Sequence, residues 1–196
     1  MRLTLLALAG LSAGLAFAQP AAAQSPFWSD PMGDQDTMKY IEGDPRALQS
    51  PIPRQVVAFT DQYAPGTIVI STSERRLYLV TGSGEAIEYG VGVGRPGFAW
   101  SGIQRVSAKK EWPAWTPPAE MRKRRPDLPA YMSGGPENPL GARAIYLGSS
   151  LYRIHGSNEP DTIGQAVSSG CIRMTNEDVI DLYGRVKVGA KVVVLD

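Results

Sequence analysis

The sequence predicts a mainly β domain with one or two short helices. Short runs of β-branched and aromatic residues, separated by glycine-rich or polar turns, recur from residue 67 to the end of the chain. One segment has the apolar spacing of a helix, and strands do not alternate with helices as they would in a parallel α/β sheet. A chain of 196 residues with 43% hydrophobic content is long enough for one domain with a substantial core.

The first predicted strands are residues 67–70, 76–80 and 86–93. The second and third are joined by the glycine-rich residues 81–85, which predicts a β-hairpin with a five-residue connection. The glycines at 90, 92 and 94 do not form a nucleotide-binding fingerprint, because Pro96 stands where the helix would have to begin. Further strands are predicted at 101–112, 142–147, 151–154 and 191–195, and a weaker one at 54–59.

A long loop separates two of these strands. Residues 112–139 contain seven prolines and two tryptophans, so they cannot continue as a strand or as a long helix. Residues 120–125 have room for one or two helical turns. Such a loop is either a lid or binding loop, or a rigid cover in which Trp112 and Trp115 fill the core rather than bind substrate.

One short helix is predicted after residue 175. Thr175 is a suitable N-cap, and Asp178 stands at the position of its reciprocal partner. Apolar residues then recur with helical spacing at Val179, Leu182, Tyr183 and Val186.

The N-terminus resembles an export signal. Arg2 is followed by an apolar segment, and small residues end it at Ala18 and at Ala23, either of which suits cleavage. The expected organisation is a cleaved signal peptide at 1–23, a partly ordered leader at 24–64 and the main domain at 65–196; the alternative for the first segment is an uncleaved anchor. The mature protein is then expected to lie in the periplasm or elsewhere outside the cytoplasm.

The charge balance argues against nucleic acid as a partner. Removing residues 1–23, whose only charge is Arg2, leaves 19 basic and 19 acidic side chains. The run Arg122–Arg125 is locally basic, and it is either a solvated loop or a contact for an anionic polymer or membrane face.

His155 and Cys171 are the only histidine and the only cysteine of the chain. An imidazole can take the proton of a thiol and so make it a nucleophile. His155 ends a predicted strand, and a loop returning beside that strand would bring Cys171 close to it. The alternative is a buried and inert thiol. An unpaired thiol in an exported protein favours reactivity, since it is exposed to oxidation.

Residues around Cys171 are candidates for substrate binding. The main-chain N–H groups of Ser169, Gly170 and Cys171 could face a carbonyl oxygen. Arg173 lies two residues beyond Cys171, where it could bind a substrate carboxylate, hold the loop, or form an ion pair with Asp178 or Glu177. One Cys and one His do not make a closed zinc site, and no phosphate-binding loop is present. No metal or cofactor is therefore expected.

These residues resemble a known family. His155-Gly156, then Ser168-Ser169-Gly170-Cys171-Ile172-Arg173-Met174, then Asp178 are similar to the active-site motif of the L,D-transpeptidase catalytic domain (YkuD family). The similarity extends from about Gly66 to Leu195. Many members have a second histidine where this chain has Ser169, so His155 alone must move the proton here.

The resemblance implies a β-sandwich-like fold and acyl transfer on peptidoglycan stems. Cys171 would be acylated by a tetrapeptide stem with release of D-Ala, His155 would carry the proton, and the main-chain carbonyl of Gly156 would orient His155. The acyl group would then pass to an amine on a neighbouring stem, on a wall-linked lipoprotein, or on a free D-amino acid. Two alternatives stay open: a hydrolase of the same fold, and a non-catalytic wall-binding module.

Overall fold

The computed structural model describes residues 50–60 and 62–196. By its internal contacts the chain divides into Met1–Gly33 and Asp34–Asp196, and all described residues belong to the second unit. The expected signal peptide and most of the expected leader therefore lie outside the described residues. Within the described part of the chain, no helix is both long and apolar enough to span a bilayer.

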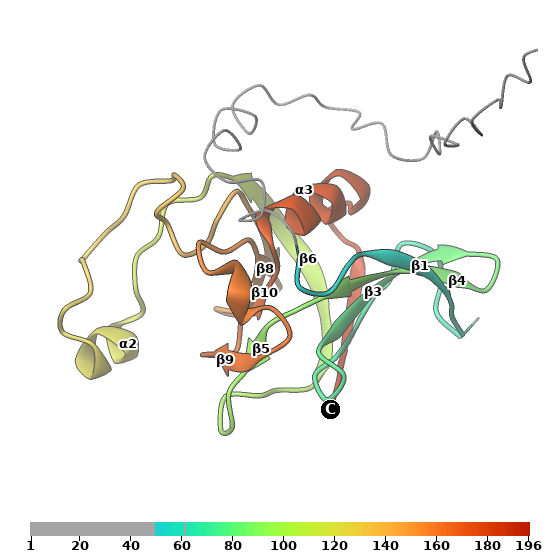
Figure 1. Ribbon diagram of the computed structural model, residues 1–196, viewed down its shortest axis with the longest axis horizontal. Coiled ribbons are helices and arrows are strands. Elements are labelled where there is room, and N and C mark those ends of the chain that lie inside the picture. The colour runs from blue at the N-terminus through green and yellow to red at the C-terminus, as the bar shows by residue number, and fades with distance from the viewer. Residues whose placement is uncertain (1–49, 61) are drawn as a thin grey trace, which may run out of the picture. The chain divides into compact units, whose positions relative to one another are not determined.

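Strands dominate this part of the chain, as the sequence predicts (Figure 1). They are β1 (Gln55–Ala58), β2 (Ile68–Ser71), β3 (Arg76–Gly82), β4 (Glu85–Gly90), β5 (Val93–Gly94), β6 (Gly102–Glu111), β7 (Arg143–Leu147), β8 (Arg153–His155), β9 (Ala166–Ser168), β10 (Ile172–Arg173) and β11 (Lys191–Leu195). The helices are α2 (Ala119–Arg124), the 3₁₀ helix η3 (Pro160–Thr162) and α3 (Asn176–Arg185).

Nine of these strands form one sheet in the order β1-β4-β3-β2-β11-β6-β7-β8-β10, and β5 pairs with β9 separately. Strand β6 joins the two parts of the large sheet. Its residues up to Arg105 pair with β11, and those from Val106 onward pair with β7 across an irregularity in register. One long strand thus connects the part of the sheet formed by β1–β4 and β11 to the part that carries β7, β8 and β10.

The central strands are those with continuous apolar runs. All four residues of β2 are buried between β3 and β11, and Val192–Val194 of β11 are buried as well. Such runs are typical of strands covered on both faces. Helix α3 begins as predicted: the Thr175 hydroxyl accepts a hydrogen bond from the Asp178 N–H at 3.2 Å, and Val179 and Leu182 are buried. The helix packs against β7 and β8.

The predicted five-residue hairpin connection is wrong. Strand β3 continues to Gly82 and β4 begins at Glu85, so only Ser83 and Gly84 form the turn. Both have positive φ, 58° and 73°, which is the conformation that matches the twist of a tight hairpin. The predicted strand 86–93 is also divided, because β4 ends at Gly90 and β5 begins only at Val93.

The end of the expected leader is part of the folded unit. Strand β1 pairs antiparallel with β4, in agreement with the weaker strand predicted at 54–59. Ile52 fills the space beside two glycines: a Cβ on Gly90 would lie 2.5 Å from the Ile52 Cβ, and one on Gly164 would lie 2.9 Å from its Cδ1. Arg54 lies 3.5 Å from carboxylate oxygens of Asp178 and Asp181 on α3.

Candidate active site

Two short parallel strands bring the predicted His155 and Cys171 to one place. Strand β8 ends at His155, and β10 pairs with it so that Ile172 faces Ile154 and Arg173 faces His155. Cys171 directly precedes β10, and the same register places it beside Arg153. Because side chains two residues apart share a face of a sheet, Cys171 and Arg173 lie on the same face as Arg153 and His155.

His155 is buried and held in one orientation. Its side chain is 4% exposed, and Nδ1 lies 2.6 Å from the carbonyl oxygen of Gly156. Since a carbonyl can only accept, Nδ1 carries the proton and Nε2 keeps its lone pair. The pKa of His155 is lowered to about 4: burial is the largest cause, the Gly156 hydrogen bond acts in the opposite direction, and the charges of Arg173 and Arg153 add to the lowering. The imidazole is therefore neutral at pH 7 and can accept a proton.

The glycine after His155 allows a close backbone approach. The Asn176 Oδ1 accepts a hydrogen bond from the Ala142 N–H at 2.9 Å, and this oxygen lies against the backbone at Gly156 and Gly141. A Cβ on either glycine would overlap the Asn176 oxygen. Asn176 thus fixes the segment whose carbonyl orients His155. In the sequence, only the two glycines themselves could have indicated this contact.

Cys171 is a free thiol that is neither fully buried nor fully exposed. Burial raises its pKa, while the main-chain N–H of Arg153 and the charges of Arg153 and Arg173 act in the opposite direction. Its Sγ lies 3.8 Å from the Leu151 carbonyl oxygen, at the limit for a weak thiol donor. A protonated thiol beside a neutral imidazole is the expected resting pair at neutral pH.

The turn before Cys171 is closed by Ser168. Its hydroxyl donates to the Cys171 carbonyl at 2.6 Å and accepts from the Gly170 N–H at 3.1 Å. The Gly170 N–H, predicted as an oxyanion donor, is therefore already bonded within the turn. Gly170 has a φ of 105°, and a Cβ there would lie 2.6 Å from Cε1 of Tyr152, so both the conformation and the space favour glycine.

Three side chains that the sequence analysis did not identify hold this turn from outside. Trp100 donates from Nε1 to the Gly170 carbonyl at 2.8 Å, and its ring stacks on Tyr152 with centroids 4.5 Å apart. Arg95 donates from Nη1 to the Ser169 hydroxyl at 3.2 Å. Trp100 and Arg95 lie about 70 positions from the turn. No local pattern could therefore indicate these contacts.

Arg173 forms an ion pair with a residue that the sequence did not indicate. Its Nη1 lies 2.8 Å from Glu159 Oε2, and its main chain exchanges hydrogen bonds with Gly92. The ion pair considered with Asp178 or Glu177 is wrong, because those carboxylates face Arg54 at the start of α3. Arg173 therefore ties β10 to the loop between β8 and β9.

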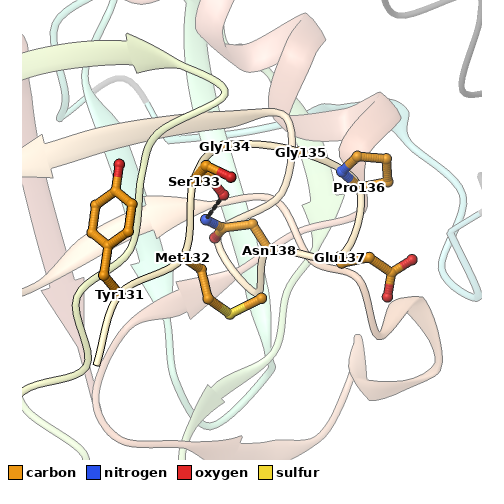
Figure 2. A pocket seen from close by; sticks show the side chains of 8 residues that line it. All are labelled: Tyr131, Met132, Ser133, Gly134, Gly135, Pro136, Glu137 and Asn138. Atoms are coloured by element: carbon orange, nitrogen blue, oxygen red, sulfur yellow. Dashed lines mark hydrogen bonds between the residues drawn. The ribbon is translucent and has the colours of Figure 1, made fainter. Parts of the chain in front are cut away.

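The long loop forms a hollow of its own. Residues 131–138 line a space of about 520 Å³ (Figure 2). Asn138 donates from Nδ2 to the Ser133 and Pro113 carbonyls at 2.9 and 3.1 Å, which closes the loop. Neither Cys171 nor His155 lines this hollow, so it is separate from the candidate site. Trp112 and Trp115 are both only partly buried. Within the described residues, no group of three or more His, Cys, Asp and Glu side chains is placed to hold a metal ion.

Known proteins share both the sequence pattern and the fold. The family model of the L,D-transpeptidase catalytic domain matches residues 65–194. The probable L,D-transpeptidase ErfK/SrfK of Escherichia coli is 39% identical over 157 residues, which are 76% of this chain and 49% of that protein. The probable L,D-transpeptidase YbiS of the same organism is 37% identical over 153 residues, 74% of this chain and 49% of its own length. The chain thus spans about half the length of these relatives.

Solved structures agree on the fold. A Brucella melitensis protein described as a probable carnitine operon oxidoreductase is 47% identical, with a TM-score of 0.51 over 78% of this chain and 99% of its own. That description is of the Brucella protein alone. An L,D-transpeptidase from Mycobacterium smegmatis has a TM-score of 0.55 over 68% of this chain and 59% of its own, at 17% identity, which shows a shared fold. With the family match over residues 65–194, the chain belongs to the L,D-transpeptidase catalytic domain family.

Proposed function

We propose that this protein is a peptidoglycan L,D-transpeptidase in which Cys171 is the nucleophile and His155 the proton carrier. The observation that carries the proposal is the pairing of β8 with β10, which puts both side chains on one face of adjacent strands. A second support is the hydrogen bond from His155 Nδ1 to the Gly156 carbonyl, which leaves Nε2 as the base.

The neutral resting pair sets the order of proton transfers. As Sγ of Cys171 attacks the carbonyl carbon of the third stem residue, Nε2 of His155 takes the thiol proton. The imidazolium then gives that proton to the nitrogen of the departing D-Ala, and a thioester remains on Cys171. An acceptor amine attacks the thioester, His155 takes a proton from it, and the thiolate leaves and is reprotonated.

The surrounding groups lower the cost of the charged intermediates. The Gly156 carbonyl strengthens its hydrogen bond when the imidazole becomes positive, which offsets part of the cost of a buried charge. Main-chain N–H groups of Ser169 and Cys171 are the proposed oxyanion donors, since the Gly170 N–H is bonded to Ser168. Arg173 holds this loop through Glu159 and adds positive charge near the thiol.

The donor is a tetrapeptide stem, and the acceptor is an amine of a second stem or of a wall-linked lipoprotein. This substrate lies outside the cytoplasmic membrane, which agrees with the export signal expected at residues 1–23 and with a periplasmic location. Cleavage of that signal and the acceptor are both accessible to mass spectrometry of the secreted protein and of digested cell wall.

The test is the intact mass of the purified protein after incubation with a tetrapeptide stem. The expected result is an acyl adduct on Cys171 with release of D-Ala, absent from a Cys171→Ala variant. An amine acceptor should convert the adduct to a crosslinked product. Tripeptide as the sole product in the presence of acceptor would establish a hydrolase instead, and a thiol that neither acylates nor reacts with a small alkylating probe would establish a binding module.

A further inference from the structure

The register of four strands, β6, β7, β8 and β10, places the basic side chains of Arg153, Lys110 and Arg173 on the face that carries the proposed nucleophile. Tyr146 of β7 faces Arg153 of β8, and the β8–β10 register puts Cys171 next in the same row. The neighbouring row lies two residues along each strand. Its members, in order across β6, β7, β8 and β10, are Lys110, Ala144, His155 and Arg173. Both rows lie on one face of the sheet.

Two cations of this face share one aromatic ring. The Arg153 guanidinium carbon lies 5.2 Å from the centroid of the Tyr146 ring, and the Lys110 ammonium lies 5.8 Å from it. Tyr146 and Arg153 are partly buried, whereas Lys110 is exposed. The ring therefore holds two positive groups close together at an accessible edge of the face.

Neither cation is neutralised within the described residues. No carboxylate lies within ion-pair distance of Arg153 or Lys110, and the buried Nε of Arg153 has no hydrogen-bond partner. Arg173 in the neighbouring row differs, because Glu159 pairs with it at 2.8 Å. A buried donor without a partner is rare and requires an explanation. An anion that reaches the partly exposed guanidinium would supply the missing charge, and the buried Nε would gain an acceptor only if the side chain shifts on binding.

We propose that Arg153, Tyr146 and Lys110 form a subsite for a carboxylate of the peptide stem, directly beside Cys171. The guanidinium of Arg153 binds the carboxylate through charge-assisted hydrogen bonds, the Tyr146 ring keeps the guanidinium in place, and Lys110 adds charge at the outer edge. The planar guanidinium can form two parallel hydrogen bonds to a carboxylate, which the ammonium group of a lysine cannot. The subsite rests on the proposed function, since it deepens the choice of donor substrate.

The carboxylate concerned belongs to one of the two residues that the scissile bond joins. When the third residue is a diamino diacid, these residues carry two free carboxylates: the terminal one of D-Ala and the one at the end of the diamino diacid side chain. The probes are therefore three stems: one with both carboxylates free, one amidated at D-Ala, and one amidated at the diamino acid. The measurement is kcat and KM for D-Ala or D-alaninamide release, with the adduct on Cys171 followed by mass.

The wild-type protein should lose about 10-fold in kcat/KM on one of the two amidated stems, chiefly through KM. Arg153→Gln should have a kcat/KM on the free stem that is lower than that of the wild type by a similar factor. Its kcat/KM on that amidated stem should equal its value on the free stem within about 2-fold. Arg153→Lys should recover part of the preference, because it keeps the charge without the fork. Lys110→Gln should show a smaller loss of the same kind.

Controls separate recognition from other effects. Lys191→Gln removes one exposed positive charge at the start of β11 and should leave the preference unchanged. The alkylation rate of Cys171 in each variant shows whether Arg153 also alters the thiol, and melting temperatures show that the variants are folded. A full wild-type preference in Arg153→Gln, or equal wild-type rates on all three stems, overturns the subsite. No wild-type adduct with any stem overturns the proposed function itself.

Discussion

The strongest test of the candidate site is the titration of its single imidazole. The sequence contains one histidine, so in untagged protein one set of imidazole resonances reports on His155 alone. Burial lowers its pKa to about 4, from an ordinary value near 6.5. We therefore expect the Cε1–H chemical shift to change with a midpoint near pH 4 and to be flat from pH 8 to pH 6.

The lowered pKa of His155 also makes the stability of the fold depend on pH. Between about pH 6.5 and pH 4 the unfolded chain binds a proton at His155 and the folded chain does not, so the free energy of unfolding falls as the pH falls. A difference of about 2.5 pH units at about 1.4 kcal/mol per unit corresponds to about 3 kcal/mol. This contribution is complete above pH 6.5 and is lost as the pH falls through 4.

A matched variant isolates this contribution. Burial raises the pKa of Asp178 to about 6, so Asp178 acts in the opposite direction and favours the folded state at low pH. The quantity to measure is therefore the difference in unfolding free energy between wild type and His155→Gln, from urea titrations at several pH values. That difference should shrink by about 3 kcal/mol from pH 7 to pH 4. A constant difference, or an imidazole midpoint near 6.5, would refute a buried neutral His155.

Three further predictions concern neighbouring groups. Because burial raises the pKa of the Cys171 thiol, its alkylation by iodoacetamide should keep accelerating from pH 7 to pH 9; a plateau below pH 7 would indicate a preformed thiolate instead. Gly156→Ala should reduce the rate of acylation by about 10-fold or more, because the added Cβ would overlap the Asn176 side chain. The control is Gly184→Ala on α3, where the added Cβ meets open space. This variant should stabilise the fold by about 0.5 kcal/mol and leave acylation unchanged. Arg54→Met should destabilise the fold at pH 7 by about 3 kcal/mol, because it removes the cation that faces a buried carboxylate; urea titration measures this, and an unchanged midpoint would contradict it.

Local patterns were sufficient for the elements whose stability is local. The closing strand was predicted at its observed bounds of Lys191–Leu195, and α3 begins at its predicted Thr175 cap. The family and the mainly β fold also followed from the sequence, through the residues around His155 and Cys171. Periodicity and capping depend on neighbours along the chain, so one sequence contains them in full.

Features that depend on distant pairing were not predictable in this way. Strands β5 and β10 are two residues long and exist only because other strands present partners to them. The ion pair between Arg173 and Glu159 is set by how the loop after β8 returns. The position of Arg153 beside Cys171 follows only from the register of β8 with β10. Contacts of this kind require the three-dimensional arrangement.

The contacts of Ile52 and Arg54 bear on where this domain can be cut. The family match begins at residue 65, yet Ile52 fills the space that Gly90 and Gly164 leave open, and Arg54 faces the acidic start of α3. A protein shortened to the matched residues would keep both reactive side chains while exposing the backbone at two glycines and leaving Asp178 without its cation. The smallest fragment able to fold stably should therefore start no later than Ile52. A protease that cleaved between β1 and β2 would then loosen the domain without touching its catalytic strands.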